Sequence, residues 1–398
     1  LLVGVGLWVS RTKKGHTKTA EDYFLASKAL PWWAIGSSLI AANISAEQFI
    51  GMSGSGFAGG LAIASYEFMA ALTLIIVGKF FLPIFIKQGI YTIPEFVEKR
   101  FSTNLKTILA VFWIALFVFV NLTSVLFLGG KAIDTIVGVG DGSMIVPAII
   151  ALAIFAAAYS LYGGLSAVAW TDVIQVALLV IGGIITTLIA LHYVTPDGGI
   201  LNGISHIADA ASDKFDMVLS RDNKEFNNLP GIYVLIGGLW VANLYYWGFN
   251  QYIIQRTLAA KSLTEAQRGI AFAAFLKMLI PFIVVIPGIV AWVMYSEDLY
   301  GARSAFEIAG STALNNDNAY PWLISTFIPV GVKGLVLAAL AAAIVSSLAS
   351  MLNSTSTIFT MDIYKPYINR EASQTKLVNV GRLTAGIALI IAVCLAPL

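Results

Sequence analysis

The stretch SSLIAANISAEQFIGMSGSGF, residues 37–57, combines the apolar side chains of a lipid-spanning helix with polar side chains that hydrocarbon excludes. Four polar residues lie within six positions, namely Asn43, Ser45, Glu47 and Gln48, and several glycines follow them. An uncompensated polar group in hydrocarbon is unfavourable by several kcal/mol, and irregular backbone is tolerated at membrane depth only where it lines a protein cavity. The stretch therefore predicts a membrane helix that is broken beside a polar cavity.

The composition of the chain indicates a membrane protein. Hydrophobic residues make up 58% and charged residues 12% of the sequence, and the mean hydropathy is +0.82. Soluble chains contain about 25% charged residues, so this chain has too little polar surface for a soluble domain of its size. The net charge of +2 is too small to indicate nucleic-acid binding, and the single Cys394 excludes an intramolecular disulfide. No Cys and His residues have metal-ligand spacing, and no motif indicates an enzyme.

Apolar runs long enough to cross a bilayer recur along the whole chain. A hydrocarbon core of ~30 Å needs roughly 20 helical residues. The sequence predicts nine such spans, at 32–53, 60–86, 107–129, 143–163, 168–193, 231–254, 268–295, 332–361 and 380–398. A partial span at 1–10 precedes them. Because the chain begins and ends inside apolar runs, we expect it to be truncated at both ends.

The distribution of Lys and Arg predicts the orientation of these spans. Sixteen Lys and Arg residues lie in the loops on one side, at 11–30, 87–106, 255–268 and 362–382. Five lie in the loops on the other side, at 54–59, 130–142, 194–230 and 296–318. The positive-inside rule places the first set in the cytoplasm.

Ionisable residues inside three predicted spans are candidates for a functional site, because placing such a residue inside a membrane is energetically unfavourable. Lys277 lies about nine residues into its span, which is deep for a side chain that snorkels to water. Glu67 lies nearer the outer end, where water contact would also explain it. Asp172 lies near a cytoplasmic end, where an ionic role and a capping or solvated role are equally consistent with the sequence.

Small and polar residues on the eighth span follow three- and four-residue steps along one helix face. They are Ala339, Ala343, Ser346, Ser350 and Asn353. Such a face favours close helix packing, and it is equally compatible with ion binding.

The first and sixth spans are the richest in Asn and Gln, and both contain small residues. Transporters with inverted repeats place broken helices at matching positions of their two repeats. A separation of five spans is the spacing of a five-plus-five inverted repeat.

Three segments resemble the sodium:solute symporter family. They read YTIPEFVEKRF at 91–101, YSLYGGLSAVAWTDVIQ at 159–175 and GGLWVANLYYWGFNQYIIQRTLAAKS at 237–262. The resemblance runs end to end and is strongest to the branch of bacterial sodium/galactose and animal sodium/glucose cotransporters. It implies an all-α integral membrane protein of the leucine-transporter type, with an extra N-terminal helix at 1–10. The inverted repeats would lie at 32–193 and 231–398, with the last helix missing.

The function that this resemblance implies is sodium-coupled import of a neutral sugar by alternating access, with galactose or glucose as the sugar. The expected setting is the bacterial inner membrane, and the expected assembly is a monomer or a weak homo-oligomer. Four residues would hydrogen-bond the sugar hydroxyls with support from Asn43, namely Gln48, Glu67, Asn243 and Lys277.

The same resemblance implies gates and an ion site. Tyr246 would stack on the sugar ring as the inner gate, and Met52 and Tyr66 would close the outer side. Sodium would be held by the carbonyl groups and hydroxyl groups of Ala41, Ile44, Ala343, Ser346 and Ser347. Oxygen ligands suit a hard cation. Asp172 is a candidate ion relay.

Because of two differences from the family pattern, the resemblance does not identify which sugar is transported. Ala70 stands where the galactose carriers have a serine, and the helix that supplies a further glutamine lies beyond residue 398. Another hexose or myo-inositol is the first alternative, and a fixed Lys disfavours an amino acid. A transporter-like sensor module of a membrane receptor is an alternative from another class. A channel is disfavoured, because the sequence contains no repeated filter or ring of like charges.

Overall fold

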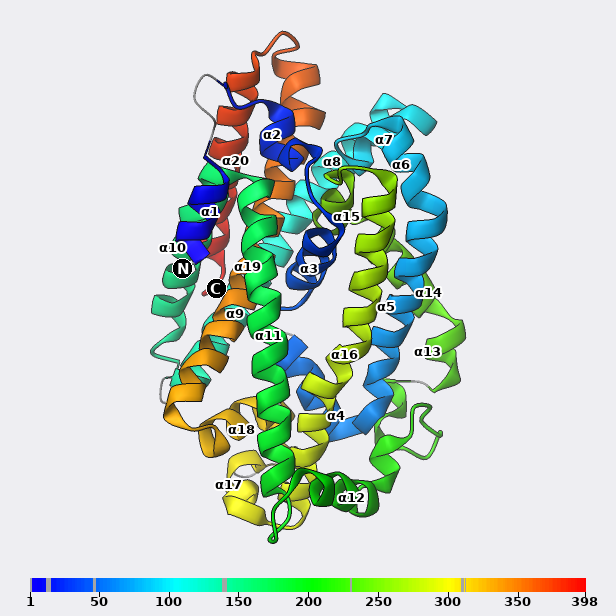
Figure 1. Ribbon diagram of the computed structural model, residues 1–398, viewed down its shortest axis with the longest axis vertical. Helices are drawn as coiled ribbons and strands as arrows, with labels where there is room; N and C mark the ends of the chain where they lie inside the picture. Colours follow the sequence, from blue (N-terminus) through cyan, green and yellow to red (C-terminus); the bar gives the residue numbers. More distant parts are fainter. Residues whose placement is uncertain are drawn as a thin grey trace.

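The computed structural model describes residues 2–11, 16–45, 48–137, 142–229, 231–308, 311 and 313–398. Glu47, one of the polar residues of the 37–57 stretch, lies outside them. The described residues are almost entirely helical (Figure 1), and their β pairing consists of two isolated bridges, Leu30–Ala260 and Glu307–Leu314.

Long helices and helix pairs cross the apolar middle of the molecule. These are α5 (Ala64–Ile76) with α6 (Leu82–Gln88), α8 (Thr103–Ala115) with α9 (Thr123–Val137), α10 (Ile145–Gly163), α11 (Leu165–Tyr193), α16 (Leu263–Ser296), α19 (Val330–Ile358) and α20 (Gln374–Leu395). Shorter helices are α1 (Leu2–Val9), α2 (Ala20–Phe24), α7 (Ile93–Arg100), α12 (Ile200–Ala210), α13 (Ile232–Ile236), α17 (Ala302–Phe306) and α18 (Ala319–Phe327).

In the described part of the chain, seven helical segments are long and apolar enough to cross a membrane, or eight if one bent pair counts as a span. Six of the predicted spans, the third to fifth and the seventh to ninth, each match one segment. The second lies within Gln48–Gln88. The first and sixth predicted spans are broken, so neither appears as an uninterrupted segment of its own. For this reason nine spans were predicted and seven uninterrupted segments are found among the described residues.

The first predicted span breaks where its polar residues lie. Helix α3 (Trp32–Asn43) ends at Ile44, whose backbone is extended with φ −81° and ψ 115°. The chain becomes helical again in a π-helical turn, η2 (Gln48–Met52), which leads into α4 (Ser53–Gly59). In Figure 1, α3 lies in the upper half of the molecule and α4 in the lower half.

The sixth predicted span breaks in a similar way. Helix α14 (Gly238–Leu244) continues through a π-helical turn, η8 (Tyr245–Phe249), to Asn250. Asn250 is extended, with φ −76° and ψ 122°, and α15 (Gln251–Leu258) follows it. Both spans therefore contain extended backbone between two helical parts, and the sixth has a further bend at Gly237, between α13 and α14.

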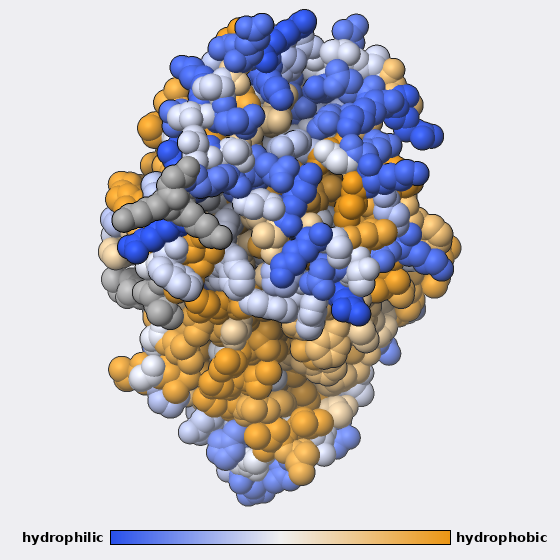
Figure 2. All heavy atoms as spheres, turned by 45° about the horizontal axis from the view of Figure 1, so that its top comes forward, coloured by the Kyte–Doolittle hydropathy of each residue, from blue (hydrophilic) through white to orange (hydrophobic). Residues whose placement is uncertain are grey.

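The surface divides into zones that agree with a membrane setting. Figure 2 shows hydrophilic residues over the end that carries α2, α7 and the start of α20, then a hydrophobic belt, then hydrophilic residues again at the far tip. The first end holds the basic loops that the positive-inside rule predicts to be cytoplasmic, and for that reason it is called the cytoplasmic end below. The end that holds α12, α17 and α18 is called the outer end.

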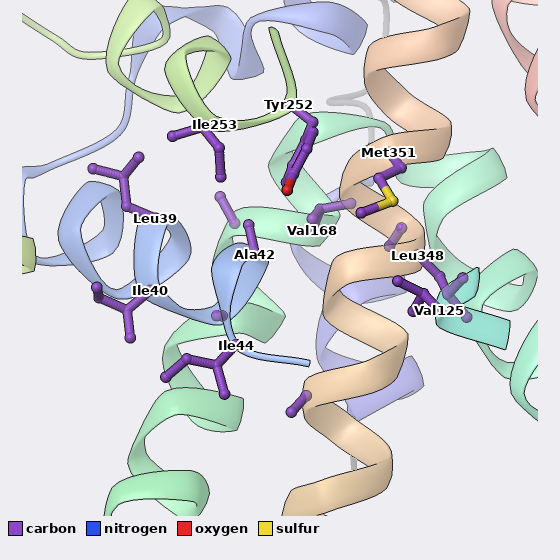
Figure 3. Close-up of a cluster of buried hydrophobic side chains, with 14 of the residues drawn as sticks. Leu39, Ile40, Ala42, Ile44, Val125, Val168, Tyr252, Ile253, Leu348 and Met351 are labelled. Atoms are coloured by element: carbon purple, nitrogen blue, oxygen red, sulfur yellow. The ribbon is translucent and has the colours of Figure 1, made fainter. Parts of the chain in front are cut away.

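Helix α3 lies at the centre of the molecule, packed against α11, α15, α16 and α19. In Figure 3, Leu39 and Ile40 lie on the side of α3 that points away from α19, whereas Tyr252 lies between α3 and Met351 of α19. These side chains are buried within one large apolar cluster. The cluster fixes the end of α3 against the middle of α19.

Helix α4 meets α16 backbone to backbone near the outer end. A Cβ atom on Gly56 would lie 2.7 Å from the Val285 carbonyl oxygen, and one on Gly288 would lie 2.1 Å from the Ser53 carbonyl oxygen. Real Cβ atoms do not approach so closely, so glycine is required at both positions for this contact.

Candidate functional site

The four residues predicted to bind a ligand come from four elements and line one cavity of about 400 Å³. We call it the charged cavity. Its lining includes Gln48 of η2, Glu67 of α5, Asn243 of α14 and Lys277 of α16. Asn43, Met52, Tyr66, Ala70 and Tyr246 line it as well.

Glu67 and Lys277 form a buried ion pair in the wall of this cavity. The Lys277 Nζ atom lies 2.5 Å from Glu67 Oε2, and the two residues are 1% and 3% exposed respectively. Lys277 Nζ also lies 5.1 Å from the centre of the Trp247 ring. Snorkelling of Lys277 and wetting of Glu67 are therefore wrong interpretations, because each charge is compensated inside the protein.

The amide side chains of the cavity retain unused hydrogen-bonding capacity. Gln48 Nε2 donates to Glu67 Oε1 over 3.4 Å, and Asn43 Nδ2 donates to the Tyr246 hydroxyl over 2.9 Å. The Gln48 Oε1 and Asn43 Oδ1 atoms are buried and have no hydrogen-bond partner among the described residues. A buried acceptor without a partner is unfavourable by about 1–3 kcal/mol, so a ligand that donates to these oxygens would be stabilised.

Asn243 has a different local role. Its Nδ2 atom donates to the Leu239 carbonyl oxygen of its own helix over 3.1 Å. That bond orients the amide plane and leaves the Oδ1 atom as an acceptor at the cavity wall.

Tyr246 lies where the charged cavity meets the cytoplasmic half of the sixth span. Its hydroxyl oxygen lies 2.6 Å from the Tyr252 hydroxyl oxygen, and Tyr252 belongs to α15. Together with Asn43, the two tyrosines connect α3, η8 and α15 through side-chain hydrogen bonds. At the other side of the cavity, Met52 is half-buried and Tyr66 is 38% exposed.

A second cavity of about 570 Å³ shares Asn43, Gln48, Met52 and Tyr246 with the charged cavity. Asn121 and Ser124, from the helix pair α8 and α9, line it too. Neither residue was predicted from the sequence. Asn121 could have been recognised as a candidate, because it is a polar residue within the apolar run at 107–129.

Ser347 of α19 lies opposite the end of α3. Its hydroxyl group is 3.0 Å from the Ala42 carbonyl oxygen, 3.4 Å from that of Ile44 and 3.3 Å from that of Ala343. The last carbonyl groups of a helix lack intrahelical partners, so the break after α3 supplies oxygen atoms here. Ala41 lies one residue earlier in the same turn and is buried.

Ser346 points to a different partner. Its hydroxyl group donates to Asp172 Oδ1 over 2.5 Å, and the Ser38 hydroxyl group donates to Asp172 Oδ2. Asp172 is fully buried, and its Oδ2 atom lies 3.7 Å from the Arg256 guanidinium. The solvated and capping interpretations of Asp172 are therefore wrong, and its environment is ionic.

Arg256 connects four elements from within the protein, and sequence reasoning did not identify it. Its guanidinium donates to the backbone and side chain of Ser38, to the Tyr252 carbonyl oxygen and to the Ser350 hydroxyl. It lies in a predicted cytoplasmic loop, where complete burial of a charged side chain is not expected.

The model of the sodium:solute symporter family matches residues 23–397. A protein of Vibrio parahaemolyticus called sodium/glucose cotransporter is 66% identical, over all of this chain and 73% of its own length. A human sodium/myo-inositol cotransporter is 33% identical, over 97% of this chain and 56% of its own length.

A solved structure of a sodium-coupled transporter resembles the whole chain. It is a substrate-bound, outward-open sodium-coupled sialic acid symporter, which aligns with a TM-score of 0.83 and 27% identity. The alignment covers 100% of this chain and 79% of that one. These findings confirm the predicted all-α membrane fold of the leucine-transporter type.

Proposed function

The chain belongs to the sodium:solute symporter family, and we propose that it imports a neutral sugar, glucose or galactose, together with sodium by alternating access. The charged cavity carries this proposal. It offers an ammonium, a carboxylate and three amides to one small ligand. A pyranose is neutral and has hydroxyl groups that both donate and accept, so it can satisfy this mixed set without adding a charge. The 66% identical Vibrio relative, named for glucose, supports the same substrate class.

We propose specific roles for the residues of this cavity. Gln48, Glu67, Asn243 and Lys277 would hydrogen-bond the sugar, and Asn43 would support them. Tyr246 would stack on the sugar ring as the inner gate, because its hydroxyl network lies toward the cytoplasmic end. Met52 and Tyr66 would close the outer side.

Myo-inositol is the second candidate, because relatives named for it match 97% of this chain. It is a neutral ring with hydroxyl groups at every carbon, so the same donors and acceptors would serve it. It differs from a pyranose in having no ring oxygen. A substrate panel must therefore contain both kinds of molecule.

Sodium would bind between α3 and α19. We propose the carbonyl oxygens of Ala41, Ile44 and Ala343 and the hydroxyl groups of Ser346 and Ser347 as ligands, with Asp172 as a relay. The convergence of backbone oxygens on Ser347 supports this site. An ion there would join two elements, and its preference for one conformation would favour that conformation.

The sodium proposal predicts a selective effect of Ser347→Ala. The alanine is nearly isosteric, so we expect a folded protein. Loss of one ligand hydroxyl, worth about 1.5–3 kcal/mol beside a charge, should raise the sodium concentration for half-maximal uptake about 10- to 100-fold. Sodium titration of sugar uptake measures it, with Ser325→Ala at the exposed end of α18 as a control. Unchanged sodium dependence in both Ser346→Ala and Ser347→Ala would show that these serines only pack.

We further propose how the molecule is organised and where it resides. Residues 32–193 and 231–398 would form the two inverted repeats of a single transporter domain, following the partial helix at 1–10. The matching breaks after Asn43 and at Asn250 support this division. The expected location is the bacterial inner membrane, with the chain acting as a monomer or a weak homo-oligomer.

Uptake by proteoliposomes tests the function directly. Purified protein is reconstituted, and radiolabelled galactose, glucose, myo-inositol and an amino acid are supplied with sodium or with potassium outside. We expect sodium-dependent uptake of a hexose, abolished or strongly reduced in Gln48→Ala. Uptake that ignores sodium, or that prefers myo-inositol or the amino acid, would refute the proposed activity.

A further inference from the structure

Lys214 of the outer loop makes an unusual contact with the first broken span. It lies in a short helical turn, η6 (Ser212–Phe215), far in sequence from α4. Its Nζ atom donates to the Phe57 carbonyl oxygen over 3.2 Å and to the Ala58 carbonyl oxygen over 2.5 Å. Both oxygens belong to the last turn of α4, where carbonyl groups lack partners within the helix.

The same ammonium also contacts α16. Lys214 Nζ lies 4.7 Å from the centre of the Trp292 ring, which is a cation–π distance. Lys214 therefore joins the outer ends of α4 and α16 with one charged group. A cation at a helix C-terminus is favourable, because the terminal carbonyl groups carry partial negative charge.

Backbone contacts hold the loop in place around this lysine. Gly60 follows α4 with φ +72°, and a Cβ atom there would lie 2.1 Å from the Lys214 carbonyl oxygen. Burial lowers the pKa of Lys214, whereas the carboxylates of Asp213 and Glu225 in the same outer loop raise it. These two carboxylates favour the charged ammonium that the contact requires.

The charged cavity is lined both by the segment that leads into α4 and by α16, the two helices that Lys214 joins. Gln48 lies in η2, which continues without interruption into α4, and Lys277 lies on α16. Along a helix that rises 1.5 Å per residue, Lys277 is about 22 Å from Trp292, so Lys214 lies outside the cavity. Its influence on a ligand would act through the positions of these helices.

We propose that Lys214 is a positioning residue for substrate binding, which sets the position of the η2–α4 segment, and hence of Gln48, relative to Lys277 on α16. The functional consequence rests on the proposed sugar site. The structural part, that Lys214 restrains α4, stands independently of the substrate.

Three variants test the proposal by uptake kinetics. Lys214→Met keeps an unbranched side chain against Trp292 but removes the hydrogen-bond donor and the charge. It should raise the sugar KM about 2- to 5-fold, the range expected from losing a favourable charge at a helix terminus, with a smaller change in kcat. Lys214→Arg retains a charged donor and should restore most of the wild-type KM. Lys224→Met removes an exposed charge from the same loop and should change neither constant.

Hydrogen–deuterium exchange provides a readout that needs no substrate. Peptides covering residues 53–59 should exchange faster in Lys214→Met than in wild-type protein or Lys224→Met, while peptides of α11 stay unchanged. If Lys214→Met exchanges faster than wild type but the wild-type protein transports no sugar, the proposed sugar site is refuted and the restraint on α4 stands. Wild-type exchange and KM in Lys214→Met would overturn the proposal, as would failure of Lys214→Arg to restore the sugar KM.

Discussion

At the residue scale, the charged cavity depends on the pairing of Glu67 with Lys277. Both groups are buried, so each is compensated chiefly by the other. Removing one partner of a buried pair is typically destabilising by about 3–5 kcal/mol, because an uncompensated charge remains. A neutral ligand that hydrogen-bonds to the pair leaves this balance intact.

We therefore expect Lys277→Met to lower both stability and uptake, through the unpaired carboxylate of Glu67. The double variant Glu67→Gln/Lys277→Met has no unpaired charge and should regain stability without regaining uptake. Thermal unfolding of the purified proteins and sugar uptake separate the two effects. A single variant that is as stable as wild type would contradict the importance of the ion pair.

Tyr246 is expected to control release of the substrate more than its affinity. Tyr246→Phe keeps the aromatic face but loses the hydroxyl contacts to Asn43 and Tyr252. A lost hydrogen bond of about 0.5–1.5 kcal/mol should speed sugar efflux by about 2- to 10-fold. Binding affinity and preloaded-vesicle efflux measure these effects. A change in which sugar is preferred would argue against a gating role.

The residues that the sequence revealed are those whose polarity conflicts with an apolar run. Glu67 and Lys277 stand out because nothing nearby in the sequence compensates them. Arg256 was not recognisable, because it lies among other polar residues at the end of a span and only the tertiary packing buries it. The pairing of Ser346 with Asp172, instead of with the carbonyl oxygens near Ser347, also requires the three-dimensional structure.

At the element scale, the two broken spans were predictable and their internal geometry was not. Asn, Gln and small residues predicted that the first and sixth spans are broken, and the structure has extended backbone at Ile44 and at Asn250. The π-helical turns η2 and η8 lie beside these breaks and rotate the following residues around the helix axis. Such turns have no clear sequence signature, so the directions of Gln48 and Tyr246 followed only from the structure.

Arg256 holds the second half of the sixth span against the rest of the molecule. It extends from α15 to Ser38 of α3, to Ser350 of α19 and toward Asp172 of α11. Arg256→Gln should lower the free energy of unfolding by about 3–5 kcal/mol, because Asp172 loses its cation.

Thermal unfolding followed by fluorescence measures this loss, with the exposed Arg221→Gln as a control. Adding Asp172→Asn to Arg256→Gln should recover part of the stability, since no charge then stays unpaired. If Arg256→Gln unfolds at the wild-type temperature, the ion pair is not a major support of α15.

At the scale of the whole molecule, the surface zones and the basic loops agree on one orientation. The hydrophobic belt of Figure 2 separates two hydrophilic ends, and the basic loops are concentrated at one of them. The two cavities share lining residues from both broken spans. A ligand bound in either cavity would contact both broken spans.

Sodium coupling predicts a dependence of sugar accumulation on membrane potential. Each sodium ion that crosses with the sugar gains ~2.3 kcal/mol per 100 mV, inside negative. One sodium per sugar should therefore raise the limiting accumulation ratio about 50-fold per 100 mV, and two should raise it by the square of that factor. Vesicles clamped with potassium and valinomycin measure the ratio. Independence from potential would exclude electrogenic symport of a neutral sugar.

The backbone contact of α4 with α16 at Gly56 and Gly288 has a consequence for a population of variants under selection. Consider a saturation library in cells that must grow on one imported carbon source. Substitutions at these two glycines remove the contact itself, so they should disappear from the library on every carbon source that the protein carries. Substitutions at Gln48 instead change how a particular ligand is held, and their survival should differ from one carbon source to the next. The depletion of each substitution across carbon sources would thus distinguish positions needed for the folded structure from positions that determine substrate specificity.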